Sequence, residues 1–308
     1  MAEFPERSIP IRSQLRAFHR RFPWLRFEEL LEYFAVYGGV EARVEFDFFE
    51  ELEESIGRHF VREFESSARW LSFAHLRERP YRELLMGIAR GDGKMLGAFR
   101  RARMGEGMGG ALLGELLERE VLRLERSREA PIRPVSGRPI RKELRGYRIQ
   151  DKVRFRRPFE RFWFAFVEPY TRELVRGEGR VFMENYRRHR ERAISLLFEQ
   201  LSSELLALHF AATDPLLSGG SHWDYHSEFD LLAHTRSGRL ILGECKYRGR
   251  PVCRKELNKL KEKAMVSGIR ADTFVLFSRS GFSRELRESE EKGVLLFELK
   301  DFERLLEE

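Results

Sequence analysis

The feature that most constrains the fold is an apolar segment between Ser227 and Gly249, SEFDLLAHTRSGRLILGECKYRG. Two runs rich in Leu, Ile and Phe flank the turn sequence TRSG, in which Gly238 tolerates a positive φ angle. This pattern predicts a β-hairpin with its turn near residue 237. The strands are apolar enough to be largely buried, yet they carry four charged side chains, which are Glu228, Asp230, Glu244 and Lys246. Charges in a buried sheet require a chemical explanation.

The register of this hairpin predicts which charges meet. A turn near residue 237 places Asp230 opposite Glu244, and Glu228 opposite Lys246. Because side chains two residues apart share a face of a strand, all four lie on one side of the sheet. Two opposed carboxylates repel each other, and a divalent cation between them relieves the repulsion. Asp230 and Glu244 are therefore candidate ligands of Mg²⁺ or Mn²⁺, with the carbonyl oxygen of Cys245 as a third ligand.

Lys246 has a chemical role in this arrangement. Its ammonium group can position or deprotonate an attacking water, or stabilise negative charge in a phosphoryl transition state. Glu228 then pairs with Lys246 or reaches the metal through water. The alternative is an edge hairpin with ordinary cross-strand ion pairs. That alternative explains Glu228 with Lys246 but not Asp230 with Glu244.

The chain before the hairpin is expected to be mainly helical. In the first 75 residues, FEELLEYFAVYGG predicts a helix that ends at Gly38, and FDFFEELEESIGRHFVREF predicts a second one of four to five turns. Their aromatic faces favour a core or a docking surface over a cofactor site. Three short helices separated by glycines follow Tyr81, and Pro and Gly turns come after them, which predicts a winged helix. A long helix then leads to the hairpin.

The residues after the hairpin predict the remainder of an α/β domain. RKELNKLKEKA reads as a helix, TFVLFS and GVLLFEL as strands, and DFERLLEE as a final helix capped by Asp301. We therefore expect an α+β multi-domain protein with a mixed central sheet. Its expected parts are a helical N-terminal region (1–78), a winged-helix-like domain (79–165) and an α/β domain (166–308).

Two groups of basic residues are candidate nucleic-acid contacts. The first lies in an Arg-rich segment on the expected wing and includes Arg141, Lys142 and Arg145. The second follows one face of the helix after the hairpin, with Lys255, Lys259 and Lys263 four residues apart. A solvated surface of mixed charge is the alternative for both groups, since the net charge of +7 is small for a chain so rich in both signs.

Bulk features favour a cytoplasmic protein with reduced thiols. The two cysteines, Cys245 and Cys253, form neither a CxxC pair nor a disulfide framework. The N-terminal sequence lacks the apolar core of a signal peptide, and no apolar run has the length of a membrane span. We expect no membrane partner. The loop HWDYH, with His222, Asp224 and His226, is interpreted as an ordered loop, with a second metal site as the alternative.

These motifs, taken in order, resemble the PD-(D/E)XK nuclease superfamily. Gly243-Glu244-Cys245-Lys246 matches the (D/E)xK half in full, and Asp230 matches the aspartate ligand, although no Pro precedes it. Glu199 fits the helix-borne glutamate of that superfamily, with Glu204 as a competitor. The resemblance implies a restriction-endonuclease-like fold, Mg²⁺ or Mn²⁺ as the cofactor and DNA as the substrate. It also implies that Glu199 orients water at the metal and that Lys246 assists the nucleophile.

The resemblance extends to a more specific group. GECKYRGRPVCRKELNKLKEKA and TFVLFSRSGFSRELRE resemble the C-terminal nuclease-like domain of the archaeal-type ATPase family, in which a winged helix precedes this domain. That family carries a P-loop, and this sequence has no GxxxxGK[ST] motif, so ATP hydrolysis is not expected. The resemblance implies a metal-dependent DNA endonuclease or a nuclease-derived DNA-processing protein. The alternative is a non-catalytic DNA-binding or regulatory module that partners a separate ATPase, and a homodimer is open in both cases.

Overall fold

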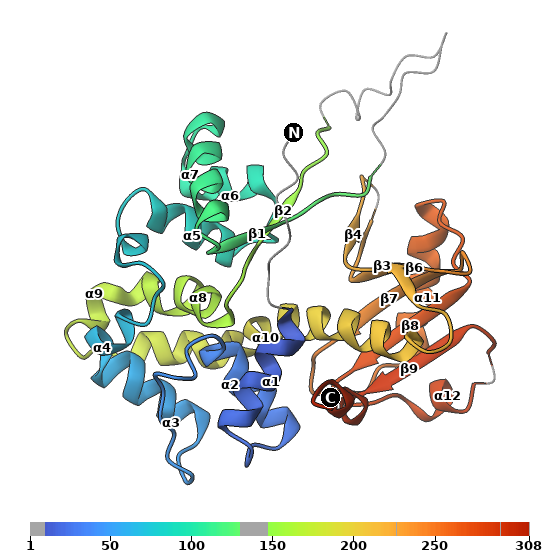
Figure 1. Ribbon diagram of the computed structural model, residues 1–308, viewed down its shortest axis with the longest axis horizontal. Coiled ribbons are helices and arrows are strands. Elements are labelled where there is room, and N and C mark those ends of the chain that lie inside the picture. Colours follow the sequence, from blue (N-terminus) through green and yellow to red (C-terminus); the bar gives the residue numbers. More distant parts are fainter. Residues whose placement is uncertain (1–9, 130–146, 226, 290, 308) are drawn as a thin grey trace. The chain divides into compact units, whose positions relative to one another are not determined.

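The computed structural model describes residues 10–129, 147–225, 227–289 and 291–307, which form two compact units (Figure 1). The helical unit contains the described residues up to Glu125 together with Lys152–Leu197. The sheet unit contains the described residues of Arg126–Asp151 and Phe198–Glu307. Helix α10 (Arg180–Phe210) contributes residues to both units. The expected mixed α/β multi-domain fold is confirmed, whereas the expected three-part division stays a prediction.

The helical unit begins with four helices, of which the second and third are separated by a loop. A π-helical turn at Arg58–Arg62 links the third and fourth helices, and a 3₁₀ turn at Ala74–Arg77 follows them. The four helices are α1 (Ile11–Arg21), α2 (Phe27–Tyr37), α3 (Leu52–Gly57) and α4 (Phe64–Ala68). Helix α2 ends before Gly38, as the sequence predicts.

The start of α3 differs from the sequence prediction, which placed a helix from Phe46 onward. Residues before Leu52 form a loop because the Phe46 ring packs against the aromatic core, with its centroid 4.6 Å from that of Phe22 and 4.8 Å from that of Tyr33. Nη2 of Arg58 also donates a hydrogen bond to the Glu45 carbonyl oxygen at 3.0 Å. These tertiary contacts outweigh the local helical periodicity.

Three helices and a two-stranded hairpin follow in the order expected of a winged helix. Strands β1 and β2 are antiparallel, and Lys94, which precedes the second helix, forms an isolated bridge with Lys152 of β2. The elements are α5 (Tyr81–Ala89), α6 (Met95–Ala102), α7 (Glu106–Glu118), β1 (Leu122–Glu125) and β2 (Lys152–Phe155). Residues 130–146 of the expected wing lie outside the described residues.

An aromatic core holds the helical unit together. The Phe60 side chain is fully buried, and its ring centroid lies 5.7 Å from that of Tyr37, 5.4 Å from that of Phe162 and 6.1 Å from that of Trp163. The aromatic segment that supplies Phe162 and Trp163 is therefore part of the core. It is built from α8 (Pro158–Phe162), a π-helical turn (Trp163–Val167), a 3₁₀ turn (Glu168–Tyr170) and α9 (Thr171–Leu174).

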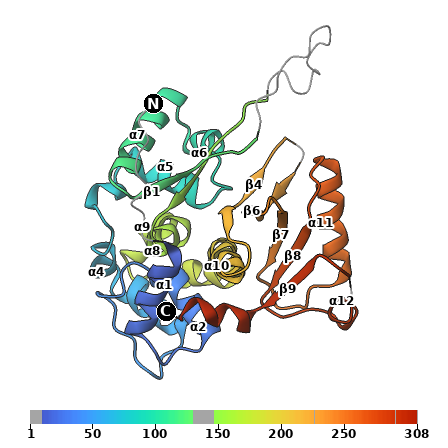
Figure 2. The same cartoon turned by 45° about the vertical axis from the view of Figure 1, so that its right-hand side comes forward.

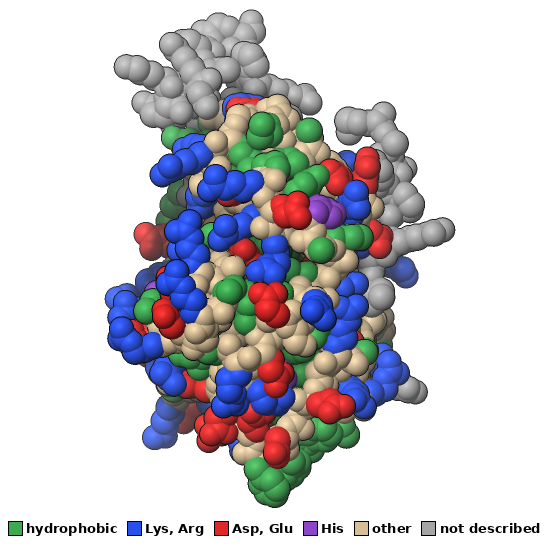
Figure 3. Space-filling model, turned by 90° about the vertical axis from the view of Figure 1, so that its left-hand side faces the viewer, with side chains coloured by type: hydrophobic (Ala, Val, Ile, Leu, Met, Phe, Trp, Pro, Cys, Tyr) green, Lys and Arg blue, Asp and Glu red, His purple; other side chains and the backbone are tan. Residues whose placement is uncertain are grey.

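Surface charges of both signs are mixed on the face seen in Figure 3. Lys and Arg side chains are interspersed with Asp and Glu, and hydrophobic side chains gather at one end of this face.

The sheet unit contains a mixed five-stranded sheet in the order β3-β6-β7-β8-β9. β3, β6 and β7 are antiparallel, whereas β7, β8 and β9 are parallel. The strands are β3 (Leu216–Ser218), β6 (Leu231–Thr235), β7 (Leu240–Lys246), β8 (Thr273–Ser278) and β9 (Val294–Glu298). A separate antiparallel pair joins β4 (His222–Trp223) to β5 (Glu228–Phe229).

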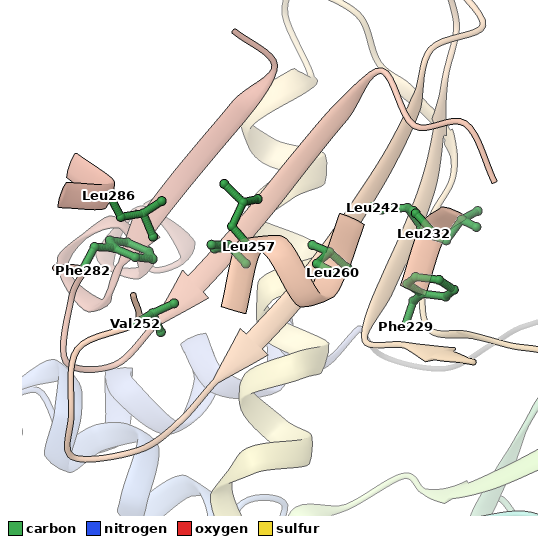
Figure 4. Packing of buried hydrophobic residues seen from close by; sticks show 10 residues of the cluster. Phe229, Leu232, Leu242, Val252, Leu257, Leu260, Phe282 and Leu286 are labelled. Carbon is green, nitrogen blue, oxygen red and sulfur yellow. The ribbon is translucent and has the colours of Figure 1, made fainter. Parts of the chain in front are cut away.

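Helices cover both faces of this sheet (Figure 2). On one face, Leu242 and Leu276 pack with Leu257 and Leu260 of α11 (Arg254–Val266), and Phe229 belongs to the same cluster (Figure 4). On the other face, the part of α10 from Phe198 onward and the final 3₁₀ turn (Leu299–Leu305) supply aromatic rings. The short helix α12 (Arg284–Arg287) follows β8. The central strands β6, β7 and β8 are largely buried on both faces, so a charge within them is exceptional.

Two further predictions concern the cap of the final helical turn and the absence of a membrane-spanning helix. The final 3₁₀ turn begins at Leu299, so Asp301 is its third residue and not the residue that precedes it. The Asp301 carboxylate still caps the turn, because it accepts a hydrogen bond from the Glu298 N–H at 2.6 Å. Within the described ranges, no helix combines the length and the apolar composition that a membrane crossing needs.

Candidate metal centre

The hairpin of β6 and β7 has the register that the sequence predicts. Leu231 pairs with Gly243 as the last pair of the ladder, and Asp230 and Glu244 follow directly, close enough for Glu244 to affect the pKa of Asp230. Gly238 occupies the turn with a φ of 88°, a conformation that glycine adopts without strain. The Cβ position of Gly243 would lie 2.8 Å from Cγ1 of Val275, so only glycine fits at the start of the GECK motif.

Asp230 lies at a bend between β5 and β6, next to the backbone of β7. Its Oδ2 accepts a hydrogen bond from the Cys245 N–H at 2.8 Å, which fixes the carboxylate beside the end of the strand. Burial, and then repulsion by Glu244, raise the pKa of Asp230 from 3.8 to about 6. Glu244 is therefore close enough to disfavour the charge of Asp230, as expected from the register.

Two ammonium groups contact the carboxylate of Glu244, whose side chain is only 12% exposed. Nζ of Lys246 lies 2.5 Å from Oε1, and Nζ of Lys263 lies 2.9 Å from Oε2. Burial lowers the pKa of Lys246, but Glu244 and Asp230 outweigh burial, so the pKa is raised. Lys246 is thus protonated at neutral pH, which favours charge stabilisation over the role of a base among the alternatives that the sequence left open.

Glu228 does not face Lys246, so this expectation from the register was wrong. The chain bends at Asp230, and β5 pairs with β4, where Glu228 lies opposite Trp223. The Glu228 side chain is exposed, while its carbonyl oxygen accepts a hydrogen bond from Nζ of Lys263 at 3.3 Å.

Glu199 approaches the motif from α10. Burial, and then Asp230, raise the pKa of the Cys245 thiol, and Glu199 adds to this effect. Glu199 therefore lies within electrostatic range of the Cys245 thiol on the α10 face of the sheet. The side chain of Glu244 points to the α11 face instead, because neighbouring side chains of a strand alternate. Cys245 and Cys253 are both free thiols, in agreement with the sequence prediction.

The donor set at the end of β7 suits a hard divalent cation. Asp230 and Glu244 supply carboxylate oxygens. Because the Cys245 N–H points toward Asp230, the carbonyl oxygen of Cys245 points toward the same edge of the strand. Mg²⁺ binds through one or two carboxylates and keeps several waters, so these three oxygens fit its coordination. In the part of the chain that the structure describes, no group of three or more His, Cys, Asp or Glu side chains is placed to hold a metal ion. In the loop HWDYH, Nε2 of His222 lies 3.8 Å from Oδ2 of Asp224.

Of the two groups of basic residues proposed to contact nucleic acid, only the lysines of α11 lie within the described residues. Arg141, Lys142 and Arg145 lie outside the described residues. Lys255 and Lys259 are exposed on α11, and Nζ of Lys259 lies 3.6 Å from Glu256 Oε1.

Lys263 was grouped with these lysines by spacing, but its ammonium contacts Glu244 instead. The sequence does not show that strands β7 and β8 are parallel and therefore joined by a crossover through α11. This crossover packs α11 on the face that carries Glu244.

Comparisons with known proteins add one family-level similarity. Residues 163–263 match DUF234, a family described as archaeal and bacterial proteins of unknown function. This range contains α10, the hairpin and most of α11. No curated protein matches the chain. The resemblance to PD-(D/E)XK nucleases therefore stays a prediction.

One solved structure has a weak similarity. It is a refined half-complex from a tetradecameric assembly of Thermococcus gammatolerans McrB AAA+ hexamers with bound McrC. The match is 16% identical, covers 97% of this chain and 77% of that chain, and has a TM-score of 0.27. At this TM-score, the similarity establishes neither a common fold nor a common function.

Proposed function

We propose that this protein hydrolyses phosphodiester bonds of DNA with the help of Mg²⁺ or Mn²⁺ held by Asp230 and Glu244. The observation that supports it best is the pair of neighbouring carboxylates, Asp230 and Glu244, beside Lys246 at the end of a strand in an otherwise apolar sheet. Ion pairing alone does not account for a buried carboxylate at position 230, because an ion pair lowers the pKa of a carboxyl whereas the surroundings of Asp230 raise it.

The bound cation supplies Lewis-acid stabilisation of charge on the phosphoryl oxygens. Asp230 and Glu244 hold that cation, and the carbonyl oxygen of Cys245 completes the protein ligands. Lys246 remains protonated, and its ammonium stabilises the negative charge that develops on the phosphoryl group. Glu199 is the proposed positioning group on α10, and Glu228 is a proposed outer carboxylate at the rim.

DNA as the substrate is supported by the lysines on α11 and by the order of elements in the helical unit. Lys255 and Lys259 present exposed ammonium groups on the helix that also carries Lys263. Helices α5–α7 with the β1–β2 hairpin follow the order of a winged helix, a motif that binds DNA in many proteins. The exposed positions of α7 include Gly107, Gly110 and Ala111, so contacts with phosphates, rather than base reading by α7, are proposed.

Cleavage of a mixed DNA panel tests the proposal. Plasmid, linear duplex, single-stranded and branched DNA would be incubated with the purified protein and Mg²⁺, Mn²⁺ or EDTA. We expect cutting with either cation and none with EDTA. We expect roughly a 100-fold loss or more in Asp230→Asn, Glu244→Gln and Lys246→Met. Glu291→Gln is the matched control, because its carboxylate pairs with Lys261 and Arg254 instead.

Two outcomes would contradict the proposal. Cutting that survives in Asp230→Asn and Lys246→Met would show that another site or a contaminant is responsible. A wild-type protein that shifts DNA in a gel without cutting any form would favour the non-catalytic DNA-binding or regulatory module, for which co-purification with a separate ATPase is the next measurement.

A further inference from the structure

Lys263 occupies a position that the proposed chemistry does not use. Its Nζ lies 2.9 Å from Oε2 of Glu244 and 3.3 Å from the carbonyl oxygen of Glu228. The other carboxylate oxygen of Glu244 contacts Lys246. Both oxygens of the principal candidate ligand are therefore held by ammonium groups, one from β7 and one from α11.

A divalent cation bound to Glu244 would approach the same carboxylate oxygens. Two positive charges at such short range repel each other strongly where water is largely excluded, so one ammonium has to withdraw when the cation binds. Lys246 comes from the strand itself, and its side chain is 24% exposed. Lys263 comes from a surface helix and its side chain is 38% exposed, which makes Lys263 the group that is free to move toward solvent.

We propose that Lys263 competes with the divalent cation for Oε2 of Glu244 and, once released, binds a phosphate group of the DNA substrate. This inference rests on the proposed function, because it concerns the same site. A lysine side chain suits both states, since its ammonium is a compact charge on a flexible stem and is a common phosphate ligand. The same residue thus lowers the affinity for the cation and raises the affinity for DNA.

The consequence is a linkage between the two ligands. The cation draws Lys263 away from Glu244 and frees its ammonium for phosphate, and DNA phosphate draws Lys263 away and frees Glu244 for the cation. Each ligand therefore binds more tightly in the presence of the other, by the same factor. Lys263 would restrict tight cation binding to the moment when substrate is present.

Lys261 provides a matched control on the same helix. Its ammonium pairs with Glu291 and lies 5.6 Å from the centroid of the Phe274 ring, so Lys261→Met removes the same charge from α11 without touching Glu244.

The test measures Mn²⁺ binding to the full chain by the electron paramagnetic resonance signal of free Mn²⁺, without reference to activity. Lys263→Met is expected to bind Mn²⁺ about tenfold more tightly than the wild type, whereas Lys261→Met is expected to stay within about twofold. A phosphorothioate duplex that resists cleavage is then added. It is expected to tighten Mn²⁺ binding by the wild type and by Lys261→Met, but not by Lys263→Met. Lys263→Gln, which keeps a polar side chain of similar length, is expected to behave like Lys263→Met.

The possible failures have different meanings. If the wild type binds Mn²⁺ and both Lys263 variants bind it no more tightly than the wild type, the proposed competition is overturned. An equal effect of the duplex on the wild type and on both Lys263 variants would overturn the phosphate role. If neither the wild type nor the Lys263 variants bind Mn²⁺, the metal site of the proposed function fails together with this inference.

Discussion

Replacing Asp230 by Asn tests whether the paired carboxylates destabilise the sheet. The Asn side chain keeps an oxygen that accepts the hydrogen bond from the Cys245 N–H, and it removes the charge that burial and Glu244 disfavour. The pKa of Asp230 is about 6 in the folded chain against an ordinary value of 3.8. A pKa difference of about two corresponds to roughly 3 kcal/mol in the free energy of unfolding.

The sign of this effect follows from proton binding. Below about pH 4, Asp230 is protonated in both the folded and the unfolded chain, so its raised pKa does not reduce stability. Between about pH 4 and pH 6 the folded chain binds more protons, and stability falls as pH rises. Above about pH 6 the ionised group destabilises the fold by its full amount. Asp230→Asn should therefore be more stable than the wild type at about pH 8, by up to roughly 3 kcal/mol, with little difference near pH 4.

Hydrogen exchange measured by mass spectrometry is the suitable assay. Because the chain has two compact units, a signal from the whole chain would mix two unfolding transitions. Peptides from β7 and β8 report the free energy of unfolding of the unit that carries Asp230. The measurement is made in EDTA with increasing urea, at an acidic and an alkaline pH. Added Mn²⁺ should then stabilise the wild type more than the variant.

Asp214→Asn is a control with the opposite sign. Hydrogen bonds from Ser237 hold the pKa of Asp214 well below its usual range, and Arg239 pairs with the same carboxylate. A lowered pKa stabilises the fold above the ordinary pKa, and this contribution is lost as the solution is acidified. Asp214→Asn should therefore be less stable than the wild type at about pH 8. The reasoning is refuted if Asp230→Asn is no more stable than the wild type at that pH, or if the difference is independent of pH.

Three further changes test the packing. Glu168→Ala should destabilise the helical unit by roughly 2 to 3 kcal/mol, measured in urea by hydrogen exchange of peptides from that unit, because the buried carboxylate accepts a hydrogen bond from the Trp163 indole and pairs with Arg82. An unchanged free energy of unfolding would contradict this role. Gly243→Ala should cost roughly 1 to 3 kcal/mol by crowding Val275, and should weaken Mn²⁺ binding because it shifts Glu244. Phe60→Ala should cost roughly 3 to 5 kcal/mol by opening a cavity in the aromatic core, and a loss below about 1 kcal/mol would contradict the packing described.

The sequence by itself determined the elements whose information is local. The position of the turn at Gly238 predicted the register of β6 and β7 correctly, and this register leads from the pair of Leu231 and Gly243 to Asp230 and Glu244. The extents of α2 and α11 also followed from periodicity and from the glycines and turns at their ends. Neighbouring residues settle these features, because a strand has a side-chain period of two and a helix one of 3.6.

Only the tertiary structure decided what surrounds the carboxylate pair. The bend at Asp230 gives Glu228 to β4 instead of Lys246, and no local pattern marks that change of partner. Lys263 reaches Glu244 because the crossover between parallel strands lays α11 over that face of the sheet. Phe46 likewise leaves its predicted helix to fill the aromatic core. In each case contacts between residues distant in the sequence outweigh local preference, since the free energy of burial and of ion pairing depends on which surfaces meet in three dimensions.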